Sequence, residues 1–255
     1  MAQPRDARGA CYNPPAMREP KDRLIVALDY PELEPALRMA DLVGPRVAML
    51  KVGLELFNSV GPPAIGALRE HGARIFYDSK FLDIPNTVAG AAAAAGRMGV
   101  SMFNVHALGG AAMMAAARDA AREAAREAGL PAPLVIGVTV LTSLGDREVR
   151  DELGLPSTAA EAALRLARLA KEAGLDGVVA SVHEVPAIKR ACGTEFLTVT
   201  PGIRPAWAAV GDQARVASPQ EALAAGADLL VIGRPITRAD DPVAALEMVL
   251  REMSA

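Results

Sequence analysis

The sequence predicts an α/β protein folded as one closed barrel of eight parallel strands, a (β/α)8 or TIM barrel. Three observations favour this class. Short apolar runs alternate with longer amphipathic runs about eight times, and no break in composition separates them. The apolar runs carry few polar residues on either face, as strands buried on both sides should. The length of 255 residues is common for a single barrel of this kind.

The elements follow from these runs in order. The first apolar run is 24–29, and Pro31 behind it suits the first turn of a helix. The predicted strands are 24–29, 47–52, 73–80, 100–106, 134–140, 177–181, 196–200 and 228–232. The predicted helices are 31–42, 61–71, 86–98, 110–128, 158–173, 184–191, 218–225 and 241–252. Strict alternation implies a parallel sheet. An open doubly wound sheet is the alternative, but no G-x-G-x-x-G follows the first strand.

Composition excludes several classes of function. The net charge is −3, so we expect neither nucleic-acid binding nor binding to a membrane surface. No apolar run approaches the roughly 20 residues of a membrane span. The chain has two cysteines, Cys11 and Cys192, and two distant cysteines do not make a disulfide framework, which favours a reducing, cytoplasmic setting. With so few histidines and no cysteine cluster, we expect no metal site built on those residues.

The first 22 residues differ from the rest of the chain. They contain Pro4, Pro14, Pro15 and Pro20, but no hydrophobic segment that could act as a secretory signal. We therefore predict a flexible N-terminal tail over 1–22 and one catalytic barrel domain over 23–255.

Charged and polar residues end several predicted strands. In chain order these are Asp29, Lys51, Asp78 with Lys80, His106, Thr142 with Ser143, Gly202 to Arg204, and Gly233 with Arg234. In a barrel the carboxyl ends of the strands meet at one mouth, where catalytic groups lie. A structural ion pair could explain one of these charges. Burying charges is costly unless they are paired, so several at one mouth favour a functional site.

The order of lysine and aspartate indicates the chemistry. Neighbours of opposite charge keep the lysines protonated and the aspartates ionised. A protonated lysine is a poor nucleophile, but it can donate a proton to a strongly basic centre. Asp78 and Lys80 are alternate residues of a strand and should share a face. The pattern predicts protonation of a carbanion, beside a carboxylate that repels a negative group of the substrate.

Asp83 does not fit the same site by its spacing. It lies three residues after Lys80, an odd offset, where the chain turns towards Pro85. Its side chain should not point where Asp78 and Lys80 point. The spacing suits a residue that serves a site elsewhere.

Two glycine–arginine pairs predict an anion site. They lie in Pro201-Gly202-Ile203-Arg204 and in Ile232-Gly233-Arg234-Pro235, after the last two strands, where barrels usually bind phosphate. Glycine lets backbone N–H groups approach phosphate oxygens. Residues 205–213 are either a loop that closes over the ligand, with Gln213 at its tip, or a plain surface loop. His106 either orients a neighbour or is a hydrogen-bonded core residue, and we favour the second interpretation.

Together these motifs resemble the orotidine 5′-phosphate decarboxylase family, of the bacterial type. The matching segments are Asp78-x-Lys80-x-x-Asp83-Ile84-Pro85-Asn86-Thr87, Ala27-Leu28-Asp29, Lys51-Val52-Gly53, Val138 to Ser143, Thr200 to Arg204 and Val231 to Pro235. The D-x-K-x-x-D part is shared with related sugar-phosphate barrels. The Ile-Pro-Asn-Thr continuation and the Gly-Ile-Arg segment narrow the resemblance to this family. It extends from about Leu24 to the last helix.

The resemblance implies decarboxylation of orotidine 5′-monophosphate to UMP, the last step of de novo pyrimidine synthesis, without a cofactor or metal. It also implies a homodimer with active sites at its interface. Lys80 would protonate C6 as carbon dioxide leaves, and Asp78 would face the substrate carboxylate. The implied charged network is Lys51, Asp78 and Lys80 with Asp83 of the partner subunit. The other implied substrate contacts are Asp29 and Lys51 at the ribose, Thr87 across the interface, Thr142 and Ser143 at the base, and Arg204, Gln213, Gly233 and Arg234, of which the last three hold the phosphate.

Two other functions stay open from the sequence. A sister enzyme could act on a sugar phosphate with Mg²⁺ through an enediolate, using the same D-x-K-x-x-D segment. A catalytically inactive barrel could bind a nucleotide as a sensor or scaffold, but intact Lys80 and Asp78 argue against this.

Overall fold

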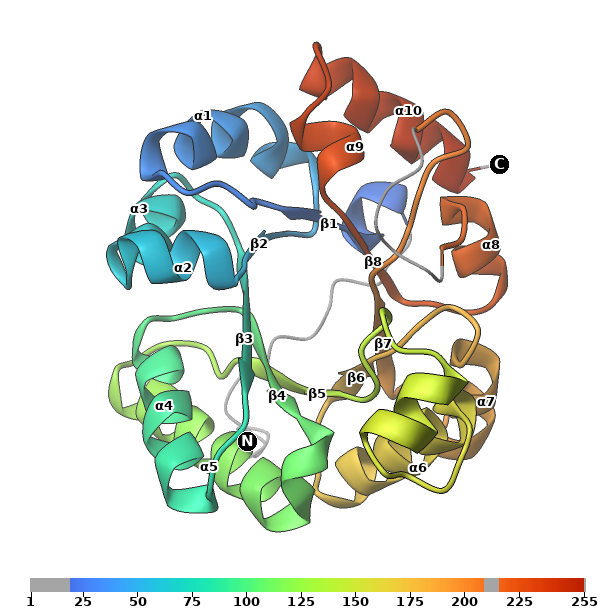
Figure 1. Cartoon of the computed structure of the whole chain (residues 1–255). Coiled ribbons are helices and arrows are strands. Elements are labelled where there is room, and N and C mark those ends of the chain that lie inside the picture. The colour runs from blue at the N-terminus through green and yellow to red at the C-terminus, as the bar shows by residue number, and fades with distance from the viewer. Residues whose placement is uncertain (1–18, 209–215, 255) are drawn as a thin grey trace, which may run out of the picture.

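A computed structural model describes residues 19–208 and 216–254 of the chain (Figure 1). Eight strands in this part of the chain form a closed barrel in sequence order, and every neighbouring pair is parallel. The strands are β1 (Leu24–Ala27), β2 (Met49–Val52), β3 (Ile75–Phe81), β4 (Met102–His106), β5 (Leu134–Val138), β6 (Gly177–Val179), β7 (Leu197–Thr200) and β8 (Leu229–Ile232). The predicted single (β/α)8 barrel is confirmed.

Helices surround the barrel (Figure 1). The main ones are α1 (Leu33–Val43), α3 (Pro63–Glu70), α4 (Pro85–Arg97), α5 (Gly110–Glu127), α6 (Ala159–Glu172), α7 (Val185–Cys192), α8 (Pro219–Ala224) and α10 (Pro242–Ser254). Two short helices that were not predicted, α2 (Leu54–Val60) and α9 (Arg234–Thr237), directly follow β2 and β8. Short 3-10 or π segments complete the set, namely η1 (Pro20–Arg23), η2 (Gly44–Arg46), η3 (Ala107–Gly109) and η4 (Glu148–Glu152). No helix of the described chain is long and apolar enough to span a bilayer.

The core has two layers because strand side chains alternate between the barrel interior and the helices. Ile25, Phe76 and Met102 belong to a cluster inside the barrel. Leu24 and Val26, on either side of Ile25, belong to the larger cluster between strands and helices. The strands therefore read as nearly continuous apolar runs, which is why the sequence could predict them.

Small residues let α4 and α5 pack closely side by side (Figure 1). A Cβ atom built on Gly96 of α4 would lie 2.4 Å from the backbone oxygen of Ala121 in α5. The contact is possible because Gly96 has no side chain. The small side chains of these alanine-rich helices thus allow a short distance between α4 and α5.

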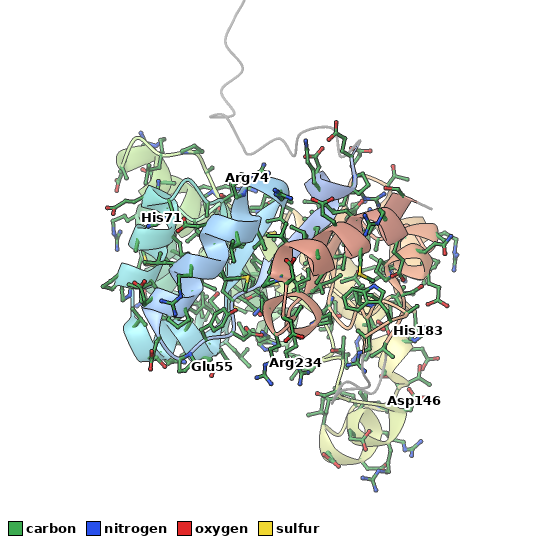
Figure 2. All side chains as sticks on the ribbon, turned by 90° about the horizontal axis from the view of Figure 1, so that it is seen from above. Glu55, His71, Arg74, Asp146, His183 and Arg234 are labelled. Carbon is green, nitrogen blue, oxygen red and sulfur yellow. The ribbon has the colours of Figure 1, made fainter. Side chains whose placement is uncertain are left out.

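Figure 2 shows the two ends of the barrel. Arg74, which precedes β3, lies at one end. Arg234 after β8 and Glu55 after β2 lie at the opposite end, at the carboxyl ends of the strands. Asp146, in the segment that joins β5 to α6, lies still farther from Arg74. This end of the barrel is the mouth at which the predicted site residues should meet.

Most of the predicted tail, residues 1–18, lies outside the described residues, so the tail stays a prediction. Pro20–Arg23 form η1. The guanidinium of Arg23 donates hydrogen bonds to the carbonyl oxygens of Ala227 and Asp228, just before β8. The chain is therefore attached to the barrel from η1 onwards.

Candidate active site

The strand ends enclose a cavity of about 480 Å³ at the mouth, a volume that suits a small ligand. Eight predicted site residues line it: Asp29, Lys51, Asp78, Lys80, Thr142, Arg204, Gly233 and Arg234. They come from positions up to 205 residues apart in the sequence, and the barrel brings them together because its parallel strands all end at the same mouth.

The charged side chains form a connected array on one wall of the cavity. Asp78 is central, because its Oδ1 lies 2.6 Å from Lys80 Nζ and its Oδ2 lies 3.4 Å from Lys51 Nζ. Lys51 Nζ also donates a hydrogen bond of 3.1 Å to Asp29 Oδ1. The side chains of Lys51 and Asp78 are only 11% and 14% exposed, whereas that of Asp29 is half exposed. The array thus runs from the barrel interior towards solvent.

The surroundings of Asp78 keep its carboxylate ionised. Burial by itself would raise the pKa of Asp78. The positive charges of Lys51 and Lys80, with hydrogen bonds from Lys80 and Asn104, outweigh burial and hold the pKa below its ordinary value. The carboxylate is therefore a fixed negative charge in the wall of the cavity.

Asp78 and Lys80 come together through an irregular strand rather than a regular one. Tyr77 pairs with Phe103 and Phe81 pairs with Val105, so β3 has two more residues than β4 between these pairs. Lys80 has a φ of 50°, the only positive φ at a non-glycine position among the described residues. Simple alternation predicted the shared face, but the backbone that produces it is a bulge.

Ser79 lies between the two charged residues and does not line the cavity. It is buried, and its hydroxyl donates a hydrogen bond of 2.7 Å to the backbone oxygen of Asn104 in β4. A polar residue is accommodated here because the neighbouring strand supplies an acceptor.

Three predicted site residues do not line the cavity of their own chain. Asp83, Thr87 and Ser143 are exposed. Asp83 Oδ1 accepts a hydrogen bond of 2.6 Å from the backbone N–H of Ile84, next to it in the sequence. Gln213 lies outside the described residues, as does most of the loop 205–213. The side chain of Asp83 is thus exposed and does not line the cavity of its own chain, which fits its odd spacing, while its role in another site stays a prediction.

The segments after β7 and β8, where the sequence predicts an anion site, line one part of the cavity. Gly202 has a φ of 78°, and the backbone N–H of Arg204 donates a hydrogen bond of 2.9 Å to Ala217. This bond ties the two sides of the loop together at its base. Gly233 immediately precedes α9, and a Cβ atom there would lie 3.4 Å from the Ala27 side chain. Arg234 follows at the mouth (Figure 2).

His106 is not the hydrogen-bonded core residue that we favoured from the sequence. Its Nδ1 is buried and has no hydrogen-bond partner in the described part of the chain. Burial lowers the pKa of His106, and the nearby positive charge of Lys80 lowers it further, while Asp78 acts in the opposite direction. The sequence interpretation failed because it gave this histidine a partner that the neighbouring strands do not supply.

Sequence reasoning missed two residues that shape the array. Asn104, buried in β4, donates a hydrogen bond of 2.7 Å to Asp78 Oδ1. Gly53 follows β2, and a Cβ atom there would lie 2.8 Å from Lys51 Nζ. The available signals were a polar residue in the middle of an apolar strand, two positions before His106, and a glycine two positions after a charged strand end.

Comparison with known proteins places these features in a family. The model of the orotidine 5′-phosphate decarboxylase / HUMPS family matches residues 22–249. Orotidine 5′-phosphate decarboxylase of Alkalilimnicola ehrlichii is 57% identical, over 91% of this chain and 97% of that protein. The enzyme of the same name from Moorella thermoacetica is 54% identical, over 91% of this chain and 92% of that protein.

A solved structure agrees. The crystal structure of orotidine 5′-phosphate decarboxylase from Lactobacillus acidophilus superposes with a TM-score of 0.80 at 40% identity, covering 91% of this chain and 99% of that one. The family match, over residues 22–249, contains every residue that lines the cavity. On this basis the chain belongs to the orotidine 5′-phosphate decarboxylase / HUMPS family.

Proposed function

We propose that this protein decarboxylates orotidine 5′-monophosphate to UMP and carbon dioxide, the last step of de novo pyrimidine synthesis. The observation that carries the proposal is the position of Asp78, buried between the ammonium groups of Lys51 and Lys80 in the barrel mouth. The family and its curated relatives support the same activity. We further propose a cytoplasmic setting, in keeping with a soluble nucleotide substrate and the buried free thiol of Cys192.

The array suits a reaction in which negative charge moves from a carboxylate to a ring carbon. Asp78 is ionised, so a substrate carboxylate placed beside it is destabilised before the reaction. As the bond from C6 to the carboxyl carbon breaks, its electron pair stays on C6 and carbon dioxide leaves. Lys80 Nζ then donates a proton to C6, and the lysine regains a proton from solvent. The ammonium groups of Lys51 and Lys80 stabilise the charge that develops on C6.

The rest of the cavity supplies binding energy at a distance from the reacting carbon. Arg204, Gly233 and Arg234 lie at the end that suits a phosphate, and we assign Gln213 to the same group. Asp29 and Lys51 suit ribose hydroxyls, because Asp29 accepts and Lys51 donates hydrogen bonds. Thr142, with Ser143 beside it, suits the base. Binding energy from the phosphate can offset the repulsion at Asp78, which links the two ends of the cavity.

Exposed apolar residues beside the mouth support a homodimer. Leu82 and Ile84 after β3 are 54% and 66% exposed, and Leu108 after β4 is 47% exposed. Large apolar side chains that gather in an exposed position are typical of a protein interface. Asp83 lies between Leu82 and Ile84. We propose that this surface meets a second copy of the chain, where Asp83 and Thr87 enter the partner's active site.

A direct assay tests the proposed activity. Purified protein should convert orotidine 5′-monophosphate to UMP, with loss of the substrate's absorbance, in buffer without added metal. The same assay with EDTA should give an unchanged rate. Loss of activity on chelation would instead favour the sister enzyme that uses Mg²⁺, and binding of UMP without any turnover would favour a nucleotide sensor.

A further inference from the structure

Asn104 contacts three consecutive residues of the neighbouring strand. Its Nδ2 donates a hydrogen bond of 2.7 Å to Asp78 Oδ1, and its Oδ1 accepts one of 2.7 Å from the backbone N–H of Lys80. Its backbone oxygen accepts a third bond, of 2.7 Å, from the Ser79 hydroxyl. The residue is 1% exposed and is not part of the cavity wall. It therefore contacts Asp78 and Lys80, the two catalytic candidates, from a buried position outside the cavity wall.

The pairing of β3 with β4 explains why Asn104 lies opposite three residues of β3. β4 lies directly beside β3 (Figure 1), and only Asn104 separates the partners of Tyr77 and Phe81. The backbone N–H of Lys80 would lack a strand partner within the bulge. The Asn104 carboxamide supplies one, as buried backbone donors require. The bulge is thus completed by a side chain rather than by the backbone of β4.

The same bond holds an unfavourable backbone conformation. A lysine with a φ of 50° crowds its own Cβ atom, so such a conformation persists only where the surroundings fix it. Asn104 fixes it at the N–H of Lys80, and a buried carboxamide in this position can have only one orientation. Its oxygen must face the N–H group, and its NH2 group must face the Asp78 carboxylate.

Asp78 and Lys80 are thereby positioned by one group. Asp78 Oδ1 accepts hydrogen bonds from both Lys80 Nζ, at 2.6 Å, and Asn104 Nδ2. We propose that Asn104 is a positioning residue for the decarboxylation: its carboxamide sets the backbone of Lys80 and the carboxylate of Asp78 so that the proton donor and the repelling charge keep a fixed separation. This inference rests on the proposed function and adds a residue to it.

Two variants test the inference. Asn104→Ala removes both side-chain bonds but leaves the bond from Ser79 to the backbone. Asn104→Asp keeps the size and an acceptor for Lys80 N–H, but places a carboxylate oxygen against Asp78. Because bonds to charged groups are lost, kcat should fall about 10- to 100-fold in each variant. KM for orotidine 5′-monophosphate should stay within about 3-fold of wild type, because Asn104 is not bonded to the residues assigned to the phosphate and the ribose.

Thr198→Val is the matched stability control. Thr198 is also buried in a strand, and its hydroxyl donates to Asp228 Oδ2 at 2.9 Å, away from the cavity. This variant should lower the melting temperature but leave kcat at the wild-type value. If the kcat of either Asn104 variant stays within about 3-fold of wild type, or falls only in proportion to its unfolded fraction, the inference is wrong.

A crystal structure of Asn104→Ala separates this inference from the proposed function. We expect φ of Lys80 to become negative. The distance from Lys80 Nζ to the Asp78 carboxylate should then exceed about 4 Å, the limit for a salt bridge. An unchanged backbone and ion pair would overturn the positioning role even if the wild type decarboxylates its substrate. If the wild type shows no turnover, the proposed function fails, and this structure still decides whether Asn104 sets the geometry.

Discussion

At the scale of single residues, the site depends on a carboxylate that is buried but still ionised. Asp78 would be costly in the barrel interior without Lys51 and Lys80, and each lysine would be costly without Asp78. The three side chains therefore form one unit, whose members cannot be replaced independently. Lys80, Gly53 and His106, in this unit or next to it, each lead to one prediction.

Lys80→Ala should remove the proton donor and leave Asp78 with Lys51 as its remaining ammonium partner. We expect kcat for orotidine 5′-monophosphate to fall by about 100- to 10,000-fold or more, since general acids contribute on this scale. Binding of UMP, measured by calorimetry, should be retained, because the phosphate end is unchanged. A variant with an undiminished rate would show that another group protonates the product.

Gly53→Ala should displace the ammonium group of Lys51. Its Cβ atom would lie 2.8 Å from Lys51 Nζ and 3.4 Å from Asp29 Oδ1, so the ammonium must shift from its present position between Asp29 and Asp78. We expect kcat/KM to fall by about 10-fold or more, as one charge-assisted contact is lost. Gly66→Ala is the control, since a Cβ atom there would contact nothing within 4 Å. Equal rates for the two variants would mean that Lys51 tolerates the shift.

His106 predicts how stability changes with pH. Its pKa is lowered in the folded state, so the unfolded chain binds a proton at higher pH than the folded chain does. The free energy of unfolding should therefore be unaffected by protonation of His106 above pH 6.5, and should decrease as pH falls below that value. The slope can reach about 1.4 kcal/mol per pH unit. Urea unfolding between pH 7 and pH 5 should show this slope in wild type and in Thr198→Val, but less of it in His106→Gln.

At the scale of elements, the contact between α4 and α5 can be tested with two glycines of one helix. Gly96→Ala places a Cβ atom 2.4 Å from the backbone oxygen of Ala121, and should destabilise the protein by about 1–3 kcal/mol. Gly90→Ala, in the same helix, meets nothing within 4 Å and should stabilise it by about 0.5–1 kcal/mol. Thermal or denaturant unfolding should give opposite signs, and a neutral Gly96→Ala would mean that α5 can move away.

Sequence patterns could predict the order of elements because each buried strand is a run of apolar residues and each helix shows an apolar stripe. They did not predict α2, since Leu54–Val60 has only seven residues, too few to show a helical period. They also missed the bulge in β3, because its positive φ falls on Lys80 rather than on a glycine that would mark it. Asn104 escaped notice because its partners are set by register, which one sequence does not reveal.

The strand-end residues were easier to predict than the contacts around them. Charged residues that end apolar runs are easy to recognise in a sequence. The barrel then places Asp29, Lys51 and Arg234 at one mouth, whatever contacts each side chain makes there. The partnerless Nδ1 of His106 and the close approach of Gly53 to Lys51 depend on distances of a few ångströms. Such distances follow from packing rather than from residue type.

At the scale of the whole molecule, the exposed position of Asp83 leads to a prediction about assembly. Inactive Lys80→Ala chains mixed with inactive Asp83→Ala chains should regain roughly a quarter of wild-type activity. Random pairing makes half of the dimers mixed, and each mixed dimer holds one intact site. Native mass spectrometry would confirm that mixed dimers form. No gain of activity in their presence would place Asp83 in the site of its own chain.

The closure of the barrel between β1 and β8 also has a consequence for folding. Leu24 pairs with Leu230 across nearly the whole chain, a contact of long sequence separation that forms slowly. Asp29 after β1 and Gly233 after β8 meet only when this seam closes, with 3.7 Å between Asp29 Oδ2 and a Cβ atom built on Gly233. A chain emerging from the ribosome therefore has no nucleotide site until its last strand is in place. UMP should slow unfolding of the finished barrel without accelerating the earlier steps of folding.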